Sequence, residues 1–464
     1  MDYDVLILGG GIIGCAVAYE LSKYNLNIAV IEKDYDVADD ISFANTAVIY
    51  DGSETKDDLM SSLEHMGNSI LAEITKKFNV PFKRIGSLRI ADTDECVEII
   101  EDMYKTAKSR GIDNIYLIDD QGVYDIEPNL RVGFKKALYS ENTAVICPYD
   151  LAIAYAEVAF DNGVNFRLEE VVQDIQKMAR GFKVTTNKNK FTCKVVINTI
   201  PGDNYTIDLN RTVINDSEGK MHYLVLDETF EHNLSNLVMK INSEDKFTFQ
   251  TPTLSGSTLV GINSERLLDF DEILREAAEI LPSVTKDNVN SIFYEDYRKD
   301  VMFIDDDQLM KGYIKVTGDH YAHITIAPSI AKMICETIVD NLNSTLKRNF
   351  VDKRREFYRF RDMSKDQRNE IIALDKRYGK IVCLCNQVSE GEIIDSIRRP
   401  LGARTVEGVK RRTGATFGNC QGAYCIDKII DIIARETDKK LTEIVEDSKN
   451  SKVLVSRIKE FEGI

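Results

Sequence analysis

Residues 5–14 of the chain read VLILGGGIIG, an apolar run that passes directly into a glycine-rich turn. The run Val5–Leu8 has the composition of a buried strand, and an apolar helix is expected over Ile12–Tyr24. A second strand is expected at Ile28–Glu32. A strand, a glycine turn, a helix and a second strand in this order predict the opening unit of a doubly wound parallel sheet.

Each glycine of the turn has its own role in binding a dinucleotide. Gly9 permits the tight turn, Gly11 lets the backbone approach a pyrophosphate, and Gly14 lets helix and sheet pack closely. The N-terminus of the helix faces the anionic phosphates. Glu32 lies 18 residues after Gly14, where a carboxylate accepts hydrogen bonds from the adenosine ribose hydroxyls. The turn therefore predicts a dinucleotide cofactor.

Four of the nine cysteines gather near the end of the chain, as Cys383-x-Cys385 and Cys420-x4-Cys425. Thiolates are soft ligands, and a set of four satisfies either zinc or an iron–sulfur cluster. The spacing matches neither the C-x2-C pairs of a zinc ribbon nor the plant-type ferredoxin pattern, so both stay open, with a cluster favoured over zinc and over disulfides. The other five cysteines lie among apolar neighbours, which predicts buried thiols in a reducing compartment.

The cysteine group bears on the choice between a nicotinamide and a flavin, which the glycine turn alone does not decide. A nicotinamide transfers a hydride, whereas a flavin can also release its electrons one at a time. A flavin can therefore supply a one-electron metal centre in the same chain. This favours FAD.

The bulk composition excludes several classes of protein. The chain has 464 residues, 43% of them hydrophobic and 29% charged, which is ordinary for two or three globular domains. A formal charge of -17 argues against nucleic-acid partners. The apolar run Val5–Ala18 follows Asp2 and Asp4 and is broken by glycines, so we expect neither a signal peptide nor a membrane span. We expect a cytoplasmic protein.

The alternation of helix and strand patterns predicts an α/β fold with a doubly wound FAD-binding domain, an inserted α+β substrate domain and a small helical C-terminal iron–sulfur domain. A helix over Pro328–Leu342 is expected to close the first fold. The expected ranges are 1–80, 141–210 and 298–345 for the FAD-binding domain, 81–140 and 211–297 for the substrate domain, 346–380 for a charged linker, and 381–464 for the cluster domain and tail.

Basic residues accumulate over residues 398–412, between the two cysteine pairs, and Glu407 is the one acidic residue of that stretch. One interpretation is a solvated helix face. The other is a cationic surface that stabilises an electron-rich cluster or binds an acidic redox partner. The residues are Arg398, Arg399, Arg404, Lys410, Arg411 and Arg412.

Nearly the whole chain resembles a known group, the FAD-dependent glycerol-3-phosphate dehydrogenases and oxidases of the D-amino-acid-oxidase-like flavoproteins. The resemblance is to the form with a C-terminal bacterioferritin-associated-ferredoxin-like domain. Residues 381–425 look like the 2Fe-2S module of that group, and residues 81–91 and 251–263 look like stretches of its flavin portion. The resemblance implies FAD and a 2Fe-2S cluster, with Cys383, Cys385, Cys420 and Cys425 as iron ligands.

The flavin-side segments depart from the pattern of the group. Residues 43–50, FANTAVIY, resemble an Asn-Ser-Gly-x-x-His segment that lies along the flavin, but the histidine position holds Tyr50 and the glycine position Ala47. Residues 199–201 replace Ala-Ala-Gly, and residues 321–325 replace Ser-Pro-Gly-Leu-Thr. The expected FAD contacts are Gly9, Gly11, Ile12, Ile13, Gly14, Glu32, Lys33, Ala44, Asn45, Thr46, Val172 and Gly318.

An enzyme of this group needs a base for the hydroxyl proton of its substrate and a cation for the anionic group. Arg298 matches the substrate-side arginine of the group, and a guanidinium can bind an anion bidentately; the alternative is a surface ion pair with a neighbouring carboxylate. Tyr50 is a poor base, because a phenol has a pKa of about 10. This leaves His320 and His323 as candidate bases.

The resemblance implies oxidation of a small anionic secondary alcohol, glycerol-3-phosphate or a 2-hydroxy acid, with electrons passed through the cluster to an acceptor protein. The altered flavin-side segments also allow a repurposed, non-catalytic redox subunit of a larger complex. Oxidation of an amine or imino acid, and a zinc-stabilised flavoprotein, are further alternatives. A homo- or hetero-oligomer is compatible with each of these.

Overall fold

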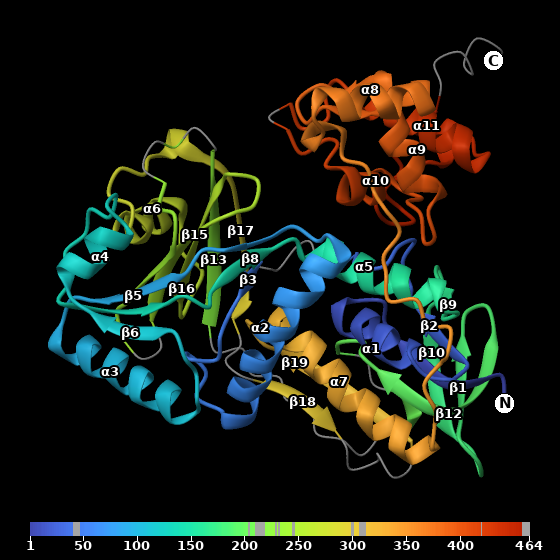
Figure 1. Ribbon diagram of the computed structural model, residues 1–464, viewed down its shortest axis with the longest axis horizontal. Helices are drawn as coiled ribbons and strands as arrows, with labels where there is room; N and C mark the ends of the chain where they lie inside the picture. The colour runs from blue at the N-terminus through green and yellow to red at the C-terminus, as the bar shows by residue number, and fades with distance from the viewer. Residues whose placement is uncertain are drawn as a thin grey trace.

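The fold combines two eight-stranded sheets with a C-terminal group of short helices (Figure 1). It is α/β, as the sequence predicts. The division into domain ranges stays a prediction. The computed structural model describes residues 1–39, 47–202, 205–208, 219–227, 230, 233–243, 246–297, 301–305, 312–418 and 420–456.

The first sheet is built around β1 (Tyr3–Leu8), which pairs in parallel with β2 (Ile28–Ile31) and β12 (Lys190–Asn198). The parallel order continues from β2 to β9 (Asn165–Arg167) and from β12 to β19 (Tyr313–Asp319). All residues of β2, and all but one of β1, are buried, as expected of strands covered on both faces. Three antiparallel strands complete the sheet: β10 (Val172–Lys177), β11 (Phe182–Thr186) and β18 (Val301–Asp305).

Four helices pack together beside this sheet: α1 (Ile12–Ser22), α2 (Asp58–Phe78), α5 (Pro148–Asp161) and α7 (His323–Leu342). Helix α7 begins five residues before the predicted start at Pro328, which lies inside it. A proline is favoured in the first turn of a helix. Here Ala322, at the group's Pro position, is the N-cap and His323, at its Gly position, is the first helical residue, so Pro328 lies beyond the first turn. Helices α2 and α7 cross closely, because a Cβ on Gly67 would lie 1.8 Å from the carbonyl oxygen of Thr325.

The second sheet is antiparallel except where β5 pairs with β14. One face of this sheet packs against Tyr50 and Ala322, so the second sheet meets the first part of the chain at the start of α7. Its strands run in the order β17 (Val289–Tyr297), β13 (Gly219–Leu226), β16 (Thr258–Ser264), β15 (Phe247–Pro252), β14 (Leu237–Ile241), β5 (Ser87–Ala91), β7 (Lys136–Ser140), β6 (Ile115–Ile118). Its helices are α3 (Asp94–Ser109), α4 (Asp120–Ile126) and α6 (Phe270–Ala278).

A three-stranded sheet lies between these parts of the chain and has β8 (Ala144–Ile146) as its central strand, with β3 (Val48–Ile49) and β4 (Phe82–Arg84) on either side. The amide of Ile146 donates a hydrogen bond of 2.9 Å to the carbonyl of Ala47. Strand β8 leads directly into α5. This strand therefore joins the segment expected along the flavin to helix α5.

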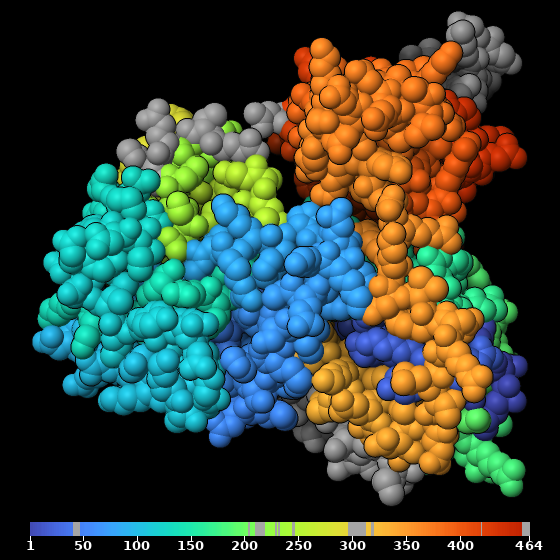
Figure 2. All heavy atoms as spheres, viewed as in Figure 1, coloured from blue at the N-terminus to red at the C-terminus, as the bar shows by residue number. Residues whose placement is uncertain are grey.

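The C-terminal residues form a module with its own apolar core, which includes Ile393, Val409 and Ile429. Residues 347–359 have no regular structure and run across the surface to reach it (Figure 2). Its helices are α8 (Lys365–Leu374), α9 (Glu390–Arg398), α10 (Val406–Thr413) and α11 (Ile426–Thr437), with strands β20 (Ile381–Cys383) and β21 (Val388–Ser389). No helix among the described residues has both the length and the apolar character needed to cross a membrane.

Candidate redox sites

The glycine turn has the geometry that a dinucleotide requires. Gly9 has φ of +99°, and a Cβ on Gly14 would lie 2.0 Å from the carbonyl oxygen of Gly9, so neither position accepts a side chain. A Cβ on Gly11 would meet nothing within 4 Å, which leaves room for a ligand over the turn. Helix α1, which starts with Ile12 and Ile13, has no acidic residue in its first turn. Its N-terminus is therefore suited to phosphate.

Glu32 lies beside the turn, as predicted. Its carboxylate accepts hydrogen bonds from the amides of Gly10, at 2.5 Å, and Asp34, at 3.0 Å. The backbone amide of Glu170 donates to the carbonyl of Glu32 at 2.8 Å, which brings the start of β10 at Val172 to the same edge. These residues fit a dinucleotide at the carboxyl ends of the parallel strands.

The other predicted FAD contacts are placed less directly. Lys33 is exposed, with its Nζ 3.7 Å from the carboxylate of Asp34. Gly318 lies in β19, opposite Met302 of β18. The predicted contacts at Ala44, Asn45 and Thr46 lie outside the described residues.

Aromatic and polar side chains meet where α7 begins. Tyr50 contacts Tyr321 edge to face, with ring centroids 4.8 Å apart, and His320 stacks on Tyr321 at 4.6 Å. The hydroxyls of Thr55 and Tyr321 are 2.6 Å apart, and Thr55 donates to Glu64 at 2.5 Å. The structure thus brings together Tyr50 and His320, which the sequence singled out, with a carboxylate that it did not.

The two candidate histidines differ in which ring nitrogen is the acceptor. Nδ1 of His320 accepts a hydrogen bond from the amide of Ala322 at 3.1 Å, and its Nε2 lies 3.5 Å from Glu64. The neutral His320 ring therefore carries its proton on Nε2. Nδ1 of His323 lies 3.2 Å from the carbonyl of His320, which can only accept, so the neutral His323 ring has Nε2 as its basic nitrogen.

Arg89 on β5 is a buried cation that the sequence analysis missed. It forms an ion pair with Glu54. Burial lowers the pKa of Arg89, while Asp51, Tyr321 and Tyr50 oppose that shift. Arg89 therefore interacts electrostatically with the two tyrosines at the start of α7. A charged residue inside the apolar strand SLRIA was the available signal. Arg298 itself lies outside the described residues, so its predicted role stays a prediction.

Asp51 is a second carboxylate that attracts Arg89, beside its ion-pair partner Glu54. Burial alone would raise the pKa of Asp51, but Arg89 and hydrogen bonds from Ser140 and Ser53 outweigh burial and lower it. Ser140 donates to the carboxylate at 2.5 Å and the Ser53 hydroxyl at 2.6 Å. Asp51 is therefore an anion, and a buried charge with partners is the arrangement that proteins tolerate.

The four predicted metal ligands lie in two loops of the module. The sulfur atoms of Cys385 and Cys420 are 3.5 Å apart. Burial and the nearby thiol of Cys383 raise the pKa of Cys425 to about 11. A Cβ on Gly418 would lie 2.3 Å from the Cβ of Cys385, so the loops leave no space for a larger residue there.

The thiols form two pairs, and a two-iron cluster takes two thiolates on each iron. Cys385 lies close to Cys420, and Cys425 lies close to Cys383, so the two loops supply the four thiolates that a 2Fe-2S cluster takes.

The interpretation of the basic residues as a solvated face is wrong for three of them. Arg399, Arg411 and Arg412 are buried, and each forms an ion pair with a carboxylate from the N-terminal half of the chain. The carboxylates that these three arginines bind therefore belong to the same chain and not to a redox partner. Arg398 is the exposed member, paired with Glu436 at 2.7 Å. Lys410 pairs with Glu407 at 3.0 Å, and Arg404 donates to the carbonyl of Ile397 at 2.9 Å.

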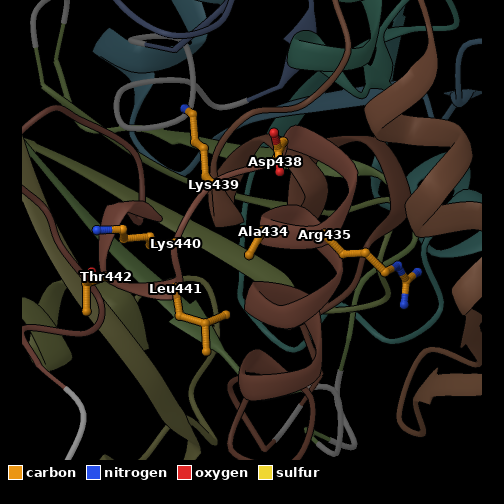
Figure 3. A pocket seen from close by; sticks show the side chains of 7 residues that line it. All are labelled: Ala434, Arg435, Asp438, Lys439, Lys440, Leu441 and Thr442. Atoms are coloured by element: carbon orange, nitrogen blue, oxygen red, sulfur yellow. The ribbon is translucent and has the colours of Figure 1, made fainter. Parts of the chain in front are cut away.

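A hollow lies at the end of α11 (Figure 3). None of the four cysteines lines it, and Lys439 of its lining lies over the ring of Tyr35, with its Nζ 5.8 Å from the ring centroid. Its lining residues are Ala434, Arg435, Asp438, Lys439, Lys440, Leu441 and Thr442.

Comparison with known proteins gives the same two parts. Residues 4–337 match the family described as FAD dependent oxidoreductase, and residues 381–435 match the BFD-like 2Fe-2S binding domain. The chain is 34% identical over 479 aligned residues to a glycerol 3-phosphate dehydrogenase of Caloramator mitchellensis, with 98% of this chain and 99% of that protein covered. FAD and a 2Fe-2S cluster are therefore its cofactors, as predicted.

Two further similarities are more limited. A match of 31% identity over 158 residues covers 33% of this chain and 34% of a mitochondrial L-2-hydroxyglutarate dehydrogenase of Nematostella vectensis. The structure of an L-alpha-glycerophosphate oxidase from Mycoplasma pneumoniae with FAD bound has a TM-score of 0.66 at 23% identity, over 77% of this chain and 99% of its own. That likeness shows the fold.

Proposed function

Because the chain belongs to the FAD dependent oxidoreductase family, we propose that it oxidises glycerol-3-phosphate and passes the electrons through its 2Fe-2S cluster to an acceptor protein. One observation carries the choice of substrate: the similarity to a glycerol 3-phosphate dehydrogenase extends over 98% of the chain and spans both redox parts. The shorter similarity to an L-2-hydroxyglutarate dehydrogenase makes 2-hydroxy acids the second class of substrate. Both are small anionic secondary alcohols.

A bound FAD would supply the hydride acceptor for the carbinol carbon of the substrate. The glycine turn with Glu32 and Val172 would hold its dinucleotide part. We assign the hydroxyl proton to Nε2 of His323, because Nδ1 of that ring donates to a carbonyl. His320 has both ring nitrogens directed at protein groups and would position Tyr321.

The anionic group of the substrate needs a cation. We assign this role to Arg298, and Arg89 beside Tyr50 and Tyr321 contributes positive charge from β5. Arg89 is paired with Glu54, so it contributes less net charge than an unpaired guanidinium. An anion clamped by a guanidinium holds the reacting carbon in one orientation.

The outer part of the cysteine module suits an acceptor protein. Cys385 is exposed, and Leu384 and Tyr424 are each 70% exposed beside the cysteines. The two cysteine loops, residues 381–389 and 413–425, contain no charged residue. None of the nine cysteines forms a disulfide, which supports a cytoplasmic location.

A non-catalytic redox subunit is the second candidate. It is favoured by Tyr50 and Tyr321 in positions where the group has His and Ser, since both rings lie at the site where substrate is expected. Such a subunit would bind FAD and cluster without accepting electrons from a small donor.

An anaerobic substrate screen tests the proposal. Glycerol-3-phosphate, 2-hydroxy acids, proline and glycine would each be added to the oxidised protein, and the visible absorbance of the flavin recorded. Bleaching by glycerol-3-phosphate but not by the amino acids is the expected result. Bleaching by none of these donors would support the non-catalytic subunit.

A further inference from the structure

The cysteine module is held against the flavin domain by buried ion pairs. Arg412 donates to Asp36 with both terminal nitrogens, one at 2.8 Å, and Arg411 pairs with Asp39. The side chains of Arg412 and Asp36 are 3% and 2% exposed. Buried pairs of this kind are screened little by salt, and losing one partner is costly. The module is therefore fixed to the flavin domain rather than loosely tethered.

A second set of pairs joins the module and the linker to α5. Glu157 accepts hydrogen bonds from Arg399 of the module, at 3.0 Å, and from Arg354 of the linker, at 2.7 Å. Arg354 also donates to Asp150 at 2.8 Å. Helix α10 lies against α5, as Figure 1 shows. Both sets of ion pairs thus hold the module over the same end of the flavin domain.

An aromatic contact lies beside these ion pairs. Tyr149, in the first turn of α5, stacks on Phe417 of the module with ring centroids 6.4 Å apart and an angle of 14° between the rings. This is the usual separation for offset-stacked rings. Lys410 covers Phe417 with its Nζ 4.7 Å from the ring centroid.

The stacked rings connect the two redox parts through few intervening groups. Phe417 precedes Gly418, whose backbone packs against the Cβ of Cys385. Tyr149 lies three residues after Ile146, and the amide of Ile146 donates to Ala47, in the segment expected along the flavin. The contact thus leads from the flavin-side segment to a cluster ligand.

We propose that the Tyr149–Phe417 stack positions the cluster for electron transfer from the flavin, with the buried arginine–carboxylate pairs holding it in place. This deepens the proposed function and rests on it. Tyr149 and Phe417 are positioning residues, because electron transfer between fixed centres falls steeply as their separation grows.

The two electrons taken from each substrate molecule leave the chain through one external reactant, a one-electron acceptor protein. Oxidation of the alcohol would deliver a hydride, with its two electrons, to FAD and the hydroxyl proton to His323, and the hydrogen carried by the hydride would leave as a proton when the flavin is reoxidised. The reduced flavin gives one electron to the oxidised cluster, and a one-electron acceptor protein removes it before the second follows. Each substrate molecule therefore reduces two acceptor molecules.

The test measures electron exchange between the two centres in the full chain loaded with FAD and iron. In one arm glycerol-3-phosphate reduces the flavin anaerobically, and in the other a laser flash photoreduces it without substrate. Freeze-quench EPR and visible absorbance follow the reduced cluster. Tyr149→Ala and Phe417→Ala are expected to slow its appearance about tenfold or more, as mispositioning does. Their FAD and iron contents and the rate of flavin bleaching by substrate should not change.

Tyr149→Phe is the matched control, because it keeps the ring and removes only the hydroxyl. It should exchange electrons at the wild-type rate. Tyr149→Leu fills the space without a ring and should behave like Tyr149→Ala, so poor folding of one variant does not decide the outcome. Wild-type exchange in both Tyr149→Ala and Tyr149→Leu would overturn the proposal. If glycerol-3-phosphate fails to reduce the flavin while the flash arm shows the slowing, the substrate assignment fails and the stack keeps its role.

Discussion

The two sides of the cysteine module differ in charge and exposure. The side against the flavin domain carries Arg399, Arg411 and Arg412, all buried in ion pairs with carboxylates of the same chain. The two cysteine loops are uncharged, and while Phe417 contacts Tyr149 of the flavin domain, the side chains of Leu384 and Tyr424 beside the cysteines are exposed. Buried charge pairs fix one geometry, whereas an uncharged exposed surface can bind and release a partner. We therefore propose that the module keeps the flavin domain as a fixed neighbour and offers its exposed surface to an exchangeable partner.

The largest expected effect is a loss of iron when one of the four cysteine ligands of the cluster is replaced. Cys425→Ser should lower the iron content more than about tenfold, because a buried thiolate ligand is lost. Cys335→Ala is the control, since burial raises the pKa of Cys335 to about 12 and makes it an inert thiol. Iron and sulfide analysis with visible spectra measures both. Full iron in Cys425→Ser would remove that residue from the ligand set.

Removing one buried arginine tests the side of the module that lies against the flavin domain, here called the inner side. Arg412→Ala should destabilise the docked module by about 3 kcal/mol, because it leaves Asp36 without its main partner. Arg398→Ala is the matched control. Its side chain is 58% exposed, so its pair with Glu436 should contribute less than about 1 kcal/mol. Denaturant unfolding of the module, followed by the visible spectrum of the cluster, compares the two; equal losses would contradict a fixed inner side.

Acid should weaken the inner side before the outer one. Arg354 and other arginines outweigh burial and hold the pKa values of Asp150 and Glu157 below their ordinary 3.8 and 4.5. A lowered pKa gives stability that is present above the ordinary value and lost as the pH falls toward the folded value. The arginines that face these two carboxylates are Arg354, Arg359, Arg399 and Arg412.

Limited proteolysis of the linker residues 347–359 at stepped pH values measures this weakening. Cleavage should be constant above pH 4.5 and increase below it. Linker cleavage that rises instead between pH 5 and pH 8 would point to groups other than these carboxylates.

The smallest effect on stability is expected from substitutions of the exposed residues beside the cysteines, here called the outer side. Tyr424→Ala and Leu384→Ala should change the free energy of unfolding by less than about 0.5 kcal/mol, as exposed substitutions do. They should slow electron delivery to an acceptor protein while flavin-to-cluster exchange stays at the wild-type rate. Steady-state reduction of a ferredoxin-type acceptor, compared with ferricyanide as a small acceptor, separates the two. Unchanged rates with the protein acceptor would contradict binding at this side.

Sequence patterns predicted the parts of the fold that depend on local chemistry. The glycine turn with Glu32 could be read from spacing, because each glycine has a local steric reason. The four cysteines could be read as a metal site from their residue type, while the choice of a 2Fe-2S cluster over zinc rested on the resemblance rather than on their spacing.

Long-range pairing could not be read from the sequence. Arg412 and Asp36 are 376 residues apart, so nothing local indicated that the basic residues face carboxylates of the same chain. Arg89 and Glu64 were missed for a similar reason, because only the packing of β5 and α2 beside α7 brings them to Tyr321. The start of α7 at His323 depended on residues that depart from the family pattern.

We propose that one chain passes electrons from FAD to its own cluster. Anaerobic addition of glycerol-3-phosphate, with the flavin absorbance and the EPR spectrum recorded together, tests this transfer. The flavin should bleach, and the EPR signal of a reduced 2Fe-2S cluster should appear in proportion to the amount of protein. Complete bleaching of the flavin with a cluster that stays oxidised would rule the transfer out.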